Sequence, residues 1–181
     1  MLPTRDDIIT MAPQGASVVE LGVAAGAFSA AMLRRGRQIA RLWSIDRWAG
    51  DRGHDDSQYA QAQAALAEFG SRSQVIRATF ERAAGMFPGG SLDMVYLDGY
   101  AHQGEGGVET LRVWWRRLKP GGVLAGHDYS QKYFPLVCDA VDAFAAEVGG
   151  QVELTGETEK RKKGIYKSWI IRKAKPEAKG Q

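Results

Sequence analysis

Residues 18–33 of the chain read VVELGVAAGAFSAAML. The segment Val18–Leu21 has the composition of a buried strand, and Gly22 and Gly26 follow it before an alanine-rich helical segment. Small residues at such a turn let the backbone pass close to a bound ligand, and the N-terminus of the next helix offers N–H donors. The stretch therefore predicts a strand, a glycine turn and a helix, with or without a ligand at the turn.

Short apolar runs recur after this stretch and alternate with segments of helical periodicity. Apolar residues three and four positions apart predict helices near 59–69, 108–118 and 134–148. Strands separated by helices are typical of right-handed βαβ crossovers and of a parallel sheet. Five parallel strands are therefore expected, at 17–21, 39–45, 74–77, 92–97 and 122–125.

The C-terminal end departs from this alternation. Residues 151–154 and 165–172 have the pattern of two strands joined by a polar loop, which favours antiparallel pairing. We therefore predict an α/β fold, with a doubly wound, Rossmann-like, seven-stranded mixed sheet that has helices on both faces and a C-terminal antiparallel hairpin. A single domain is expected over residues 1–173, followed by a disordered basic tail at 174–181.

The composition excludes several classes of protein. A length of 181 residues with 44% hydrophobic and 25% charged residues is ordinary for a globular domain. The single cysteine, Cys138, excludes an intramolecular disulfide and a multi-cysteine zinc site. No apolar run approaches the ~20 residues of a membrane span, and residues 1–10 lack a signal-peptide core. A cytoplasmic protein without a membrane partner is expected.

The net charge of +3 hides an asymmetry along the chain. Residues 159–181 carry 9 Lys+Arg and 2 Asp+Glu, a balance of +7, so residues 1–158 have a balance of 3 − 7 = −4. A basic end can bind nucleic acid, but a solvated terminus is the commoner case. Nucleic acid is therefore not the expected partner.

Two acidic residues give the glycine turn a chemical character. The spacing Gly-x-x-x-Gly does not match the Gly-x-Gly-x-x-Gly fingerprint of dinucleotide-binding proteins, which argues against a nicotinamide-dependent oxidoreductase. Glu20 precedes the first glycine, where a carboxylate would repel a pyrophosphate but attract an ammonium or sulfonium group. Asp46 closes the next strand, in the position that accepts ribose hydroxyls. The pair indicates a nucleoside site without phosphates.

The order of these motifs resembles that of the class I S-adenosylmethionine (SAM)-dependent methyltransferases. ELGVAAG at 20–26 and Asp46 resemble the first two motifs, and LDG at 97–99, KPGG at 119–122 and the terminal strand pair follow in the family's order. The resemblance implies SAM as the cofactor. Its binding residues would be Gly22 and Gly26 at the methionine moiety, Glu20 at its amino group, Asp46 at the ribose with Arg47 and Trp48 beside it, Thr79 and Phe80 near the adenine, and Asp98 closing the site.

A second group of polar residues follows the fourth and fifth expected strands. Asp98 ends the fourth strand, His127 and Asp128 end the fifth, and His102 follows shortly after Asp98. The carboxyl ends of parallel strands meet at one edge of the sheet, so these side chains are expected to converge. Carboxylates with a histidine can bind a hard divalent cation or supply a general base.

This segment resembles small O-methyltransferases related to those that act on sugars of macrolide and aminocoumarin antibiotics. The resemblance implies methyl transfer to a hydroxyl of a sugar, polyol or phenol, with His102, Asp98 and Asp128 as catalytic residues. It also implies a Mg²⁺-type ion on Asp98, His127 and Asp128, which would lower the pKa of the acceptor hydroxyl. His102 stands four residues after Asp98 instead of the family's three, so the alternative is that His102 is an exposed loop residue. The alternative for His127 is a buried histidine that orients Asp128.

Two other functions stay open at this point. A nucleic-acid methyltransferase would use the basic C-terminal end, although Asp98-Gly99-Tyr100-Ala101 lacks the Asn/Asp-Pro-Pro-aromatic motif of enzymes that methylate base amines. A non-catalytic nucleoside-binding module is the other alternative. A homodimer could supply a wall for the acceptor site.

Overall fold

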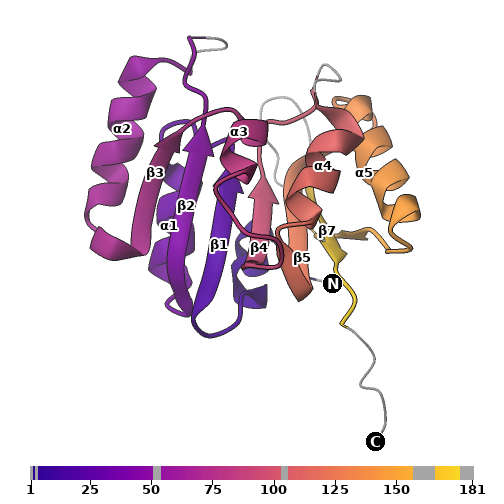
Figure 1. Cartoon of the computed structure of the whole chain (residues 1–181). Coiled ribbons are helices and arrows are strands. Elements are labelled where there is room, and N and C mark those ends of the chain that lie inside the picture. The colour runs from indigo at the N-terminus through magenta and orange to yellow at the C-terminus, as the bar shows by residue number, and fades with distance from the viewer. Residues whose placement is uncertain (1, 3, 51–53, 103–105, 157–165, 176–181) are drawn as a thin grey trace, which may run out of the picture.

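A computed structural model describes residues 2, 4–50, 54–102, 106–156 and 166–175. Its centre is one seven-stranded sheet with the order β3-β2-β1-β4-β5-β7-β6 (Figure 1). The first five strands are parallel, and β7 pairs antiparallel with both β5 and β6. The strands are β1 (Ala16–Leu21), β2 (Ile39–Asp46), β3 (Ser73–Arg77), β4 (Leu92–Leu97), β5 (Leu118–Tyr129), β6 (Glu153–Leu154) and β7 (Lys167–Arg172).

Helices cover both faces of the sheet. In Figure 1, α4 and α5 lie in front of the strands and α1 lies behind them. The helical elements are η1 (Arg5–Met11), α1 (Ala27–Arg35), α2 (Asp56–Ala67), η2 (Gly70–Arg72), α3 (Phe80–Ala84), α4 (Gly107–Trp115) and α5 (Pro135–Glu147), where η denotes a 3-10 helix.

The strands are apolar on both sides because each face has its own core. Val19 and Leu21 pack with residues of α3, α4 and α5, whereas Val18 packs with residues of η1 and α1. Successive side chains of a strand point to opposite faces, so a largely apolar strand such as β1 is buried on both of them. The predicted fold class, including the antiparallel C-terminal pair, is confirmed.

Several boundaries differ from those predicted, and three of them are instructive. Leu118 continues the apolar pattern of α4, but it begins β5 and pairs with Leu92. Phe69 continues the pattern of α2, but that helix ends at Ala67 and Phe69 precedes η2. The first C-terminal strand is shorter than predicted, since β6 is Glu153–Leu154. Periodicity alone does not mark a helix end, because core packing demands apolar residues on either side of it.

Some predicted features lie outside the described residues. These are Ile165 of the last strand, the basic run at 160–163, and residues 176–181 of the tail. Among the helices that are described, none has both the length and the apolar character that would be needed to cross a membrane.

The fold brings the strand ends of interest to one edge of the sheet. β1 and β4 are neighbours although β2 and β3 come between them in sequence, so the order of the sheet reverses beside β1. Ligands of open α/β sheets bind beyond the carboxyl ends of the strands at such a point. Leu21, Asp46, Leu97 and Tyr129 are the last residues of the four strands concerned.

Candidate active site

The glycine turn after β1 is held in shape by its neighbours. Gly22 has a positive φ of 85°, and a Cβ atom added there would lie 1.8 Å from the backbone oxygen of Asp98. Gly26 has a φ of 84° at the N-cap of α1, where a Cβ atom would lie 3.2 Å from Cα of Ala62 in α2. Both glycines are therefore required by local packing, whether or not a ligand also approaches them.

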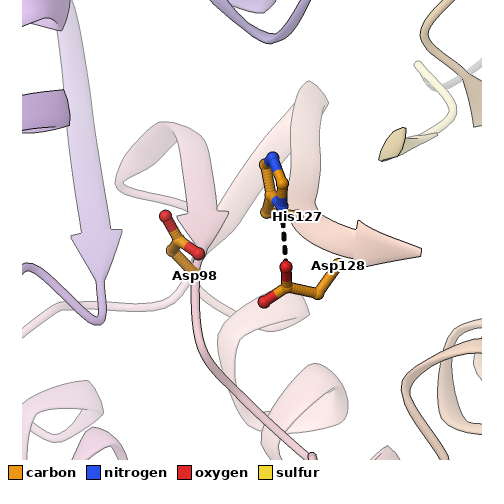
Figure 2. Close-up of side chains that lie close together, drawn as sticks. All are labelled: Asp98, His127 and Asp128. Atoms are coloured by element: carbon orange, nitrogen blue, oxygen red, sulfur yellow. Dashed lines mark hydrogen bonds and ion pairs between the residues drawn. The ribbon is translucent and has the colours of Figure 1, made fainter. Parts of the chain in front are cut away.

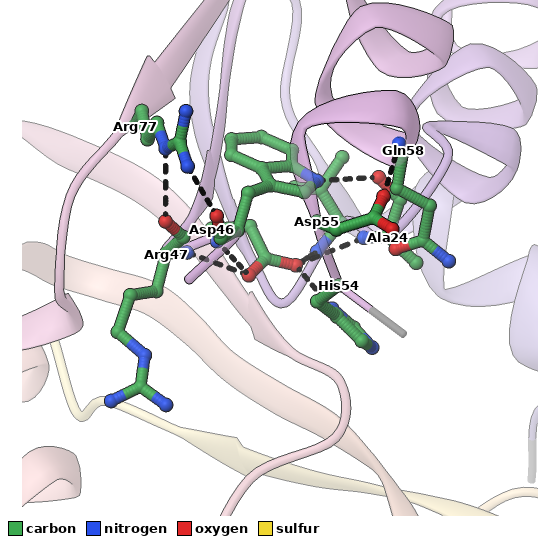
Figure 3. A network of polar contacts seen from close by, with 9 residues as sticks. Ala24, Asp46, Arg47, His54, Asp55, Gln58 and Arg77 are labelled. Carbon is green, nitrogen blue, oxygen red and sulfur yellow. Dashed lines mark hydrogen bonds and ion pairs between the residues drawn. The ribbon is translucent and has the colours of Figure 1, made fainter. Parts of the chain in front are cut away.

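Asp46 fastens this turn to the end of β2 (Figure 3). Its Oδ2 accepts hydrogen bonds from the backbone N–H groups of Val23 at 2.9 Å and Ala24 at 3.0 Å. Its Oδ1 accepts from the backbone N–H groups of Arg47 at 2.6 Å and Trp48 at 3.3 Å. The carboxylate that was predicted to bind ribose therefore also organises the backbone of the glycine turn, and its role toward a ribose stays a prediction.

A histidine also contacts this carboxylate. Nδ1 of His54 lies 3.1 Å from Oδ2 of Asp46, and a third of the His54 side chain is exposed. Next to it, Asp55 caps α2 by accepting hydrogen bonds from the backbone N–H groups of Ser57 and Gln58. The start of α2 therefore lies beside the end of β2.

Trp48 is part of the support of this turn. It is fully buried with a positive φ of 43°, its indole Nε1 donates to the backbone oxygen of Ala24 at 2.9 Å, and its ring packs against Tyr59. The Arg77 guanidinium donates to the backbone oxygens of Arg47 and Trp48. Arg47 itself has an exposed side chain. Trp48 thus joins the backbone after β2 to the glycine turn, and its predicted place beside a ribose stays a prediction.

Glu20 lies beneath the glycine turn and is almost completely buried. The hydroxyl of Ser29 in α1 donates to its Oε2, and Ser29 Oγ lies 2.7 Å from Ser44 Oγ in β2. Burial raises the pKa of Glu20 from 4.5 to about 8, against the opposing effects of Ser29 and Arg5. The carboxyl group is therefore mainly protonated at neutral pH, in the floor of the site.

Thr79 and Phe80 lie where β3 passes into α3. The Thr79 hydroxyl accepts a hydrogen bond from the Arg82 N–H at 3.3 Å and so caps α3. Phe80 is half-buried and packs against the core on the α4 side of the sheet. The backbone N–H of Ala78, just before them, donates to the backbone oxygen of Asp46. Both residues therefore lie at the correct sheet edge for an adenine, and that contact stays a prediction.

Asp128 lies between two histidines at the end of β5. Its Oδ2 is 2.8 Å from Nε2 of His102, and its Oδ1 is 2.9 Å from Nδ1 of His127. The pairing of β5 with β7 shifts register between Gly126 and Tyr129, and Asp128 has a positive φ of 62°. Such an irregularity re-aims a side chain at the end of a strand. It turns the Asp128 carboxylate toward both imidazoles.

Burial alone would raise the pKa of Asp128, but hydrogen bonds from His102 and His127 and the charges of both rings hold it below its ordinary value. The carboxylate is therefore ionised at neutral pH. His127 is buried, and the indole of Trp169 donates to its backbone oxygen. His102 is less buried and stacks on Phe134, with ring centroids 4.2 Å apart. The longer spacing after Asp98 thus does not prevent His102 from reaching Asp128.

Asp98 completes this group of residues at the end of β4. One ligand atom from each of Asp98, His127 and Asp128 lies within 4.8 Å of the others (Figure 2). The backbone N–H of Asp98 donates to Leu21, so the cluster directly adjoins the glycine turn. The Asp98 carboxylate also pairs with Arg5 of η1, at 2.9 Å between Nη2 and Oδ2. The predicted convergence of the four polar residues is therefore present.

A family model described as a methyltransferase domain matches residues 19–129, which is more than half of the chain. The chain belongs to this family. The match runs from β1 to the end of β5, so it includes the glycine turn, Asp46 and the Asp98 cluster of the methyltransferase. The coarse part of the resemblance, a class I SAM-dependent methyltransferase with SAM as cofactor, is confirmed, whereas the O-methyltransferase subgroup is not established.

Solved structures with the same fold include several methyltransferases. A SAM-dependent methyltransferase from Aquifex aeolicus has a TM-score of 0.67 at 14% identity, over 93% of this chain and 89% of its own. A SAM-dependent O-methyltransferase from Thermotoga maritima has a TM-score of 0.65 at 14% identity, over 92% of this chain and 63% of its own. At these identities the likeness shows the fold alone.

The methyltransferase also shares its fold with spermidine synthases. The enzyme from Thermotoga maritima has a TM-score of 0.68 at 14% identity, over 97% of this chain. The chain spans 57% and 59% of the length of the two spermidine synthases that it matches. No curated protein sequence matches the methyltransferase.

The residues near Asp98 do not fit a magnesium ion. Mg²⁺ prefers an octahedron of oxygen ligands, whereas this group offers two carboxylates and one imidazole. Both oxygens of Asp128 already accept from histidines, and the Arg5 guanidinium supplies a positive charge at Asp98. The Mg²⁺ site implied by the resemblance is therefore not supported, and the chemistry proposed below uses no metal.

Three residues of the methyltransferase site were not predicted from the sequence. Arg5 contacts Asp98 across 93 positions, and Arg77 and His54 support the backbone around Asp46. None of them belongs to a recognisable motif. The sequence signal is their position: Arg77 is the last residue of β3 and His54 follows the end of β2, at the edge where the site was expected.

Proposed function

We propose that the methyltransferase moves a methyl group from SAM to a hydroxyl group of a small ring compound, a sugar or a phenol, with His102 as the general base. The observation that carries this proposal is the contact of His102 with the ionised Asp128, which lies near Asp98, the residue whose backbone adjoins the glycine turn. A neutral alcohol is a poor nucleophile, so a base that takes its proton during the transfer speeds the reaction.

The hydrogen bond between the two residues favours one arrangement of the His102 ring. With Nε2–H donating to Asp128 Oδ2, Nδ1 carries the lone pair that can accept a proton. Stacking on Phe134 fixes the plane of the ring. Asp128 is then a positioning residue, because it orients the imidazole and stabilises the imidazolium that forms.

The transfer step balances without a further reactant. Bound SAM supplies a methyl group on a sulfonium centre. The acceptor oxygen forms a bond to the methyl carbon as the sulfur–carbon bond breaks, and the hydroxyl proton passes to Nδ1 of His102. The products are a methyl ether, S-adenosylhomocysteine (SAH) and a protonated His102. The chain contributes the position of the oxygen relative to the methyl group, which is the main source of acceleration in such a reaction.

Aromatic rings beside His102 support a ring-shaped acceptor. The ring of Phe134 lies 5.2 Å from that of Tyr166, which in turn lies 5.5 Å from that of Tyr133. Tyr133 is exposed, in contrast to the buried Tyr166. The flat faces of sugars and phenols pack well against such rings.

The first experiment combines titration calorimetry and product analysis. The purified chain is titrated with SAM and SAH, with and without magnesium, and is then incubated with methyl-labelled SAM and panels of sugars, phenols and RNA. Micromolar binding that magnesium does not change, with label on a ring hydroxyl, is the expected result. Binding without transfer to any acceptor favours a nucleoside-binding module, and label on RNA favours a nucleic-acid methyltransferase.

Substitution of the two central residues tests the mechanism. His102→Gln is expected to lower kcat by about 10²- to 10⁴-fold with an unchanged SAH dissociation constant, because it removes only the base. Asp128→Asn is expected to lower kcat as well, and Asp128→Glu to restore part of it. His54→Gln is the contrasting variant: His54 contacts Asp46 on the cofactor side, so any loss is expected in the affinity for SAM and not in kcat at saturating SAM. An unchanged kcat for His102→Gln refutes the assignment of the base.

A further inference from the structure

Arg5 lies in an unusual place for a charged residue near a chain end. It is the first residue of η1, whose Ile8 and Ile9 are buried in the core behind the sheet. The Arg5 guanidinium carbon lies 3.6 Å above the ring of Phe28 in α1, and only 13% of the side chain is exposed. A stacked and largely buried guanidinium has a fixed position and a strong local field.

The same guanidinium reaches the floor of the glycine turn. Arg5 Nη2 lies 2.9 Å from Asp98 Oδ2, and the backbone of Asp98 touches Gly22 so closely that a side chain there would clash. About a quarter of the Asp98 side chain is accessible, so the pair is open to a ligand lying over the turn. A positive and a negative group therefore lie side by side at the bottom of the cofactor site.

The nearby acidic group does not cancel the charge of Arg5. Glu20 lies close enough for an electrostatic effect on Arg5, but burial raises its pKa to about 8, which leaves it mainly neutral at pH 7. Asp6 also acts on Arg5, but its carboxylate is paired with Arg35. The charges that remain at the turn are thus one guanidinium and one carboxylate. This arrangement is the complement of a zwitterionic amino-acid head group, which carries one ammonium and one carboxylate.

We propose that Arg5 binds the α-carboxylate of the methionine moiety of SAM, while Asp98 accepts its ammonium group. This assignment rests on the proposed function, since it takes SAM as the methyl donor. The internal ion pair would be exchanged for two charge-assisted pairs with the ligand, so neither buried charge would lose its partner. The site would therefore read the amino-acid end of the cofactor as well as its nucleoside end.

A purely structural role for Arg5 makes a different prediction. The ion pair with Asp98 also ties η1 to the end of β4, and loss of that tie would lower stability and weaken all ligands alike. Arg35 of α1 provides the matched control. It pairs at 3.0 Å with Asp6, which belongs to η1 as Arg5 does, but Arg35 itself does not lie at the glycine turn. Arg35→Met breaks a tie to η1 while Arg5 and Asp98 both remain, and it leaves Asp6 as an added negative charge near Arg5.

The test compares SAH with its decarboxylated counterpart, which keeps the ammonium group but lacks the carboxylate. Dissociation constants are measured by calorimetry for the wild type and for Arg5→Met, Arg5→Lys and Arg35→Met. The wild type and Arg35→Met are expected to prefer SAH by about 10- to 100-fold, as for a hydrogen bond to a charged group. Arg5→Met is expected to lose this preference, and Arg5→Lys to keep part of it.

The remaining outcomes overturn the proposal in distinguishable ways. If the wild type binds both ligands equally, or if Arg5→Met weakens both by the same factor, Arg5 has only the structural role. If the wild type binds neither ligand, the SAM assignment itself fails, and the head-group assignment fails with it. Should Arg5→Met not fold, as judged by circular dichroism, the preference measured for Arg5→Lys decides: an undiminished preference contradicts the proposal.

Discussion

Asp46 shows how one side chain can serve both the fold and the site. Its two oxygens accept four backbone N–H groups, two from the glycine turn and two from the segment after β2. A residue whose only task was to bind ribose would be dispensable for folding, and its removal often leaves stability unchanged. The structure implies the opposite for Asp46.

Asp46→Asn is therefore expected to destabilise the ligand-free protein. The new amide nitrogen cannot accept hydrogen bonds, so buried N–H groups lose their partner at a cost of about 1–3 kcal/mol. Urea denaturation without SAM measures this change. His54→Gln serves as the control, because it changes only the contact between the partly exposed His54 ring and Asp46 and leaves the four backbone hydrogen bonds in place. Equal stability of Asp46→Asn and wild type would mean that the turn is held by other contacts.

Glu20 makes stability depend on pH in a defined direction. Its pKa is about 8 in the folded chain and about 4.5 when unfolded, so the folded state binds the extra proton between these values. The contribution of Glu20 to the free energy of unfolding is then greatest below about pH 4.5 and falls as the pH rises toward 8. Glu20→Gln removes the effect, since the amide stays neutral.

The expected result is a melting temperature for Glu20→Gln close to that of wild type at pH 5 and above it at pH 9. Differential scanning fluorimetry at both pH values measures the difference. Glu81→Gln in α3 replaces an exposed carboxylate and is expected to follow the wild type at both. Parallel pH curves for wild type and Glu20→Gln would show that Glu20 is not protonated in the folded state.

At the scale of elements, α2 begins at the site and depends on a single cap. Asp55 Oδ1 accepts from the N–H groups of Ser57 and Gln58, and these hydrogen bonds lower the pKa of Asp55. Asp55→Ala is expected to lower the melting temperature by about 2–4 °C, and Asp55→Asn to restore most of it, because asparagine caps helices as well. A thermal melt of both variants tests this, and equal losses would point to charge instead of capping.

The order of the elements could be predicted from the sequence, whereas some of their ends could not. Alternation of apolar runs with helical periodicity predicts the five parallel strands, because a strand buried on both faces is rich in apolar residues. Leu118 was placed in a helix, since its apolar side chain suits either the end of α4 or the start of β5. Only the pairing with Leu92, 26 residues away, decides between them.

The convergence of polar residues could be predicted where it follows strand ends, but not where it depends on distant contacts; the roles of these residues stay predictions. Asp98, His127 and Asp128 end two adjacent strands, so their convergence follows from the topology. The spacing of His102 argued against its taking part, yet positive φ angles at Gly99 and Ala101 shape a loop that returns it to Asp128. Arg5 had no local signal at all.

At the scale of the whole molecule, the segment that matches the family and some of the residues proposed to contact the acceptor lie in different parts of the chain. The family match ends at residue 129, the last residue of β5. Phe134 and Tyr166, which form the aromatic surface near His102, follow that boundary, and Arg5 precedes the match. The shared core thus holds most of the expected cofactor residues, Arg5 lies outside it, and the segment after residue 129 is where acceptor choice is expected to arise.

The hydrogen bonds from the glycine turn to Asp46 have a consequence for motion. Both donors and acceptor belong to the chain itself, so the turn needs no ligand group to hold its shape and little backbone order remains to be gained on binding. Amide protons of Val23 and Ala24 are therefore expected to exchange slowly with deuterated solvent before SAM is added, and to change little afterwards. Hydrogen exchange followed by NMR would reveal this rigidity as protection that predates the ligand.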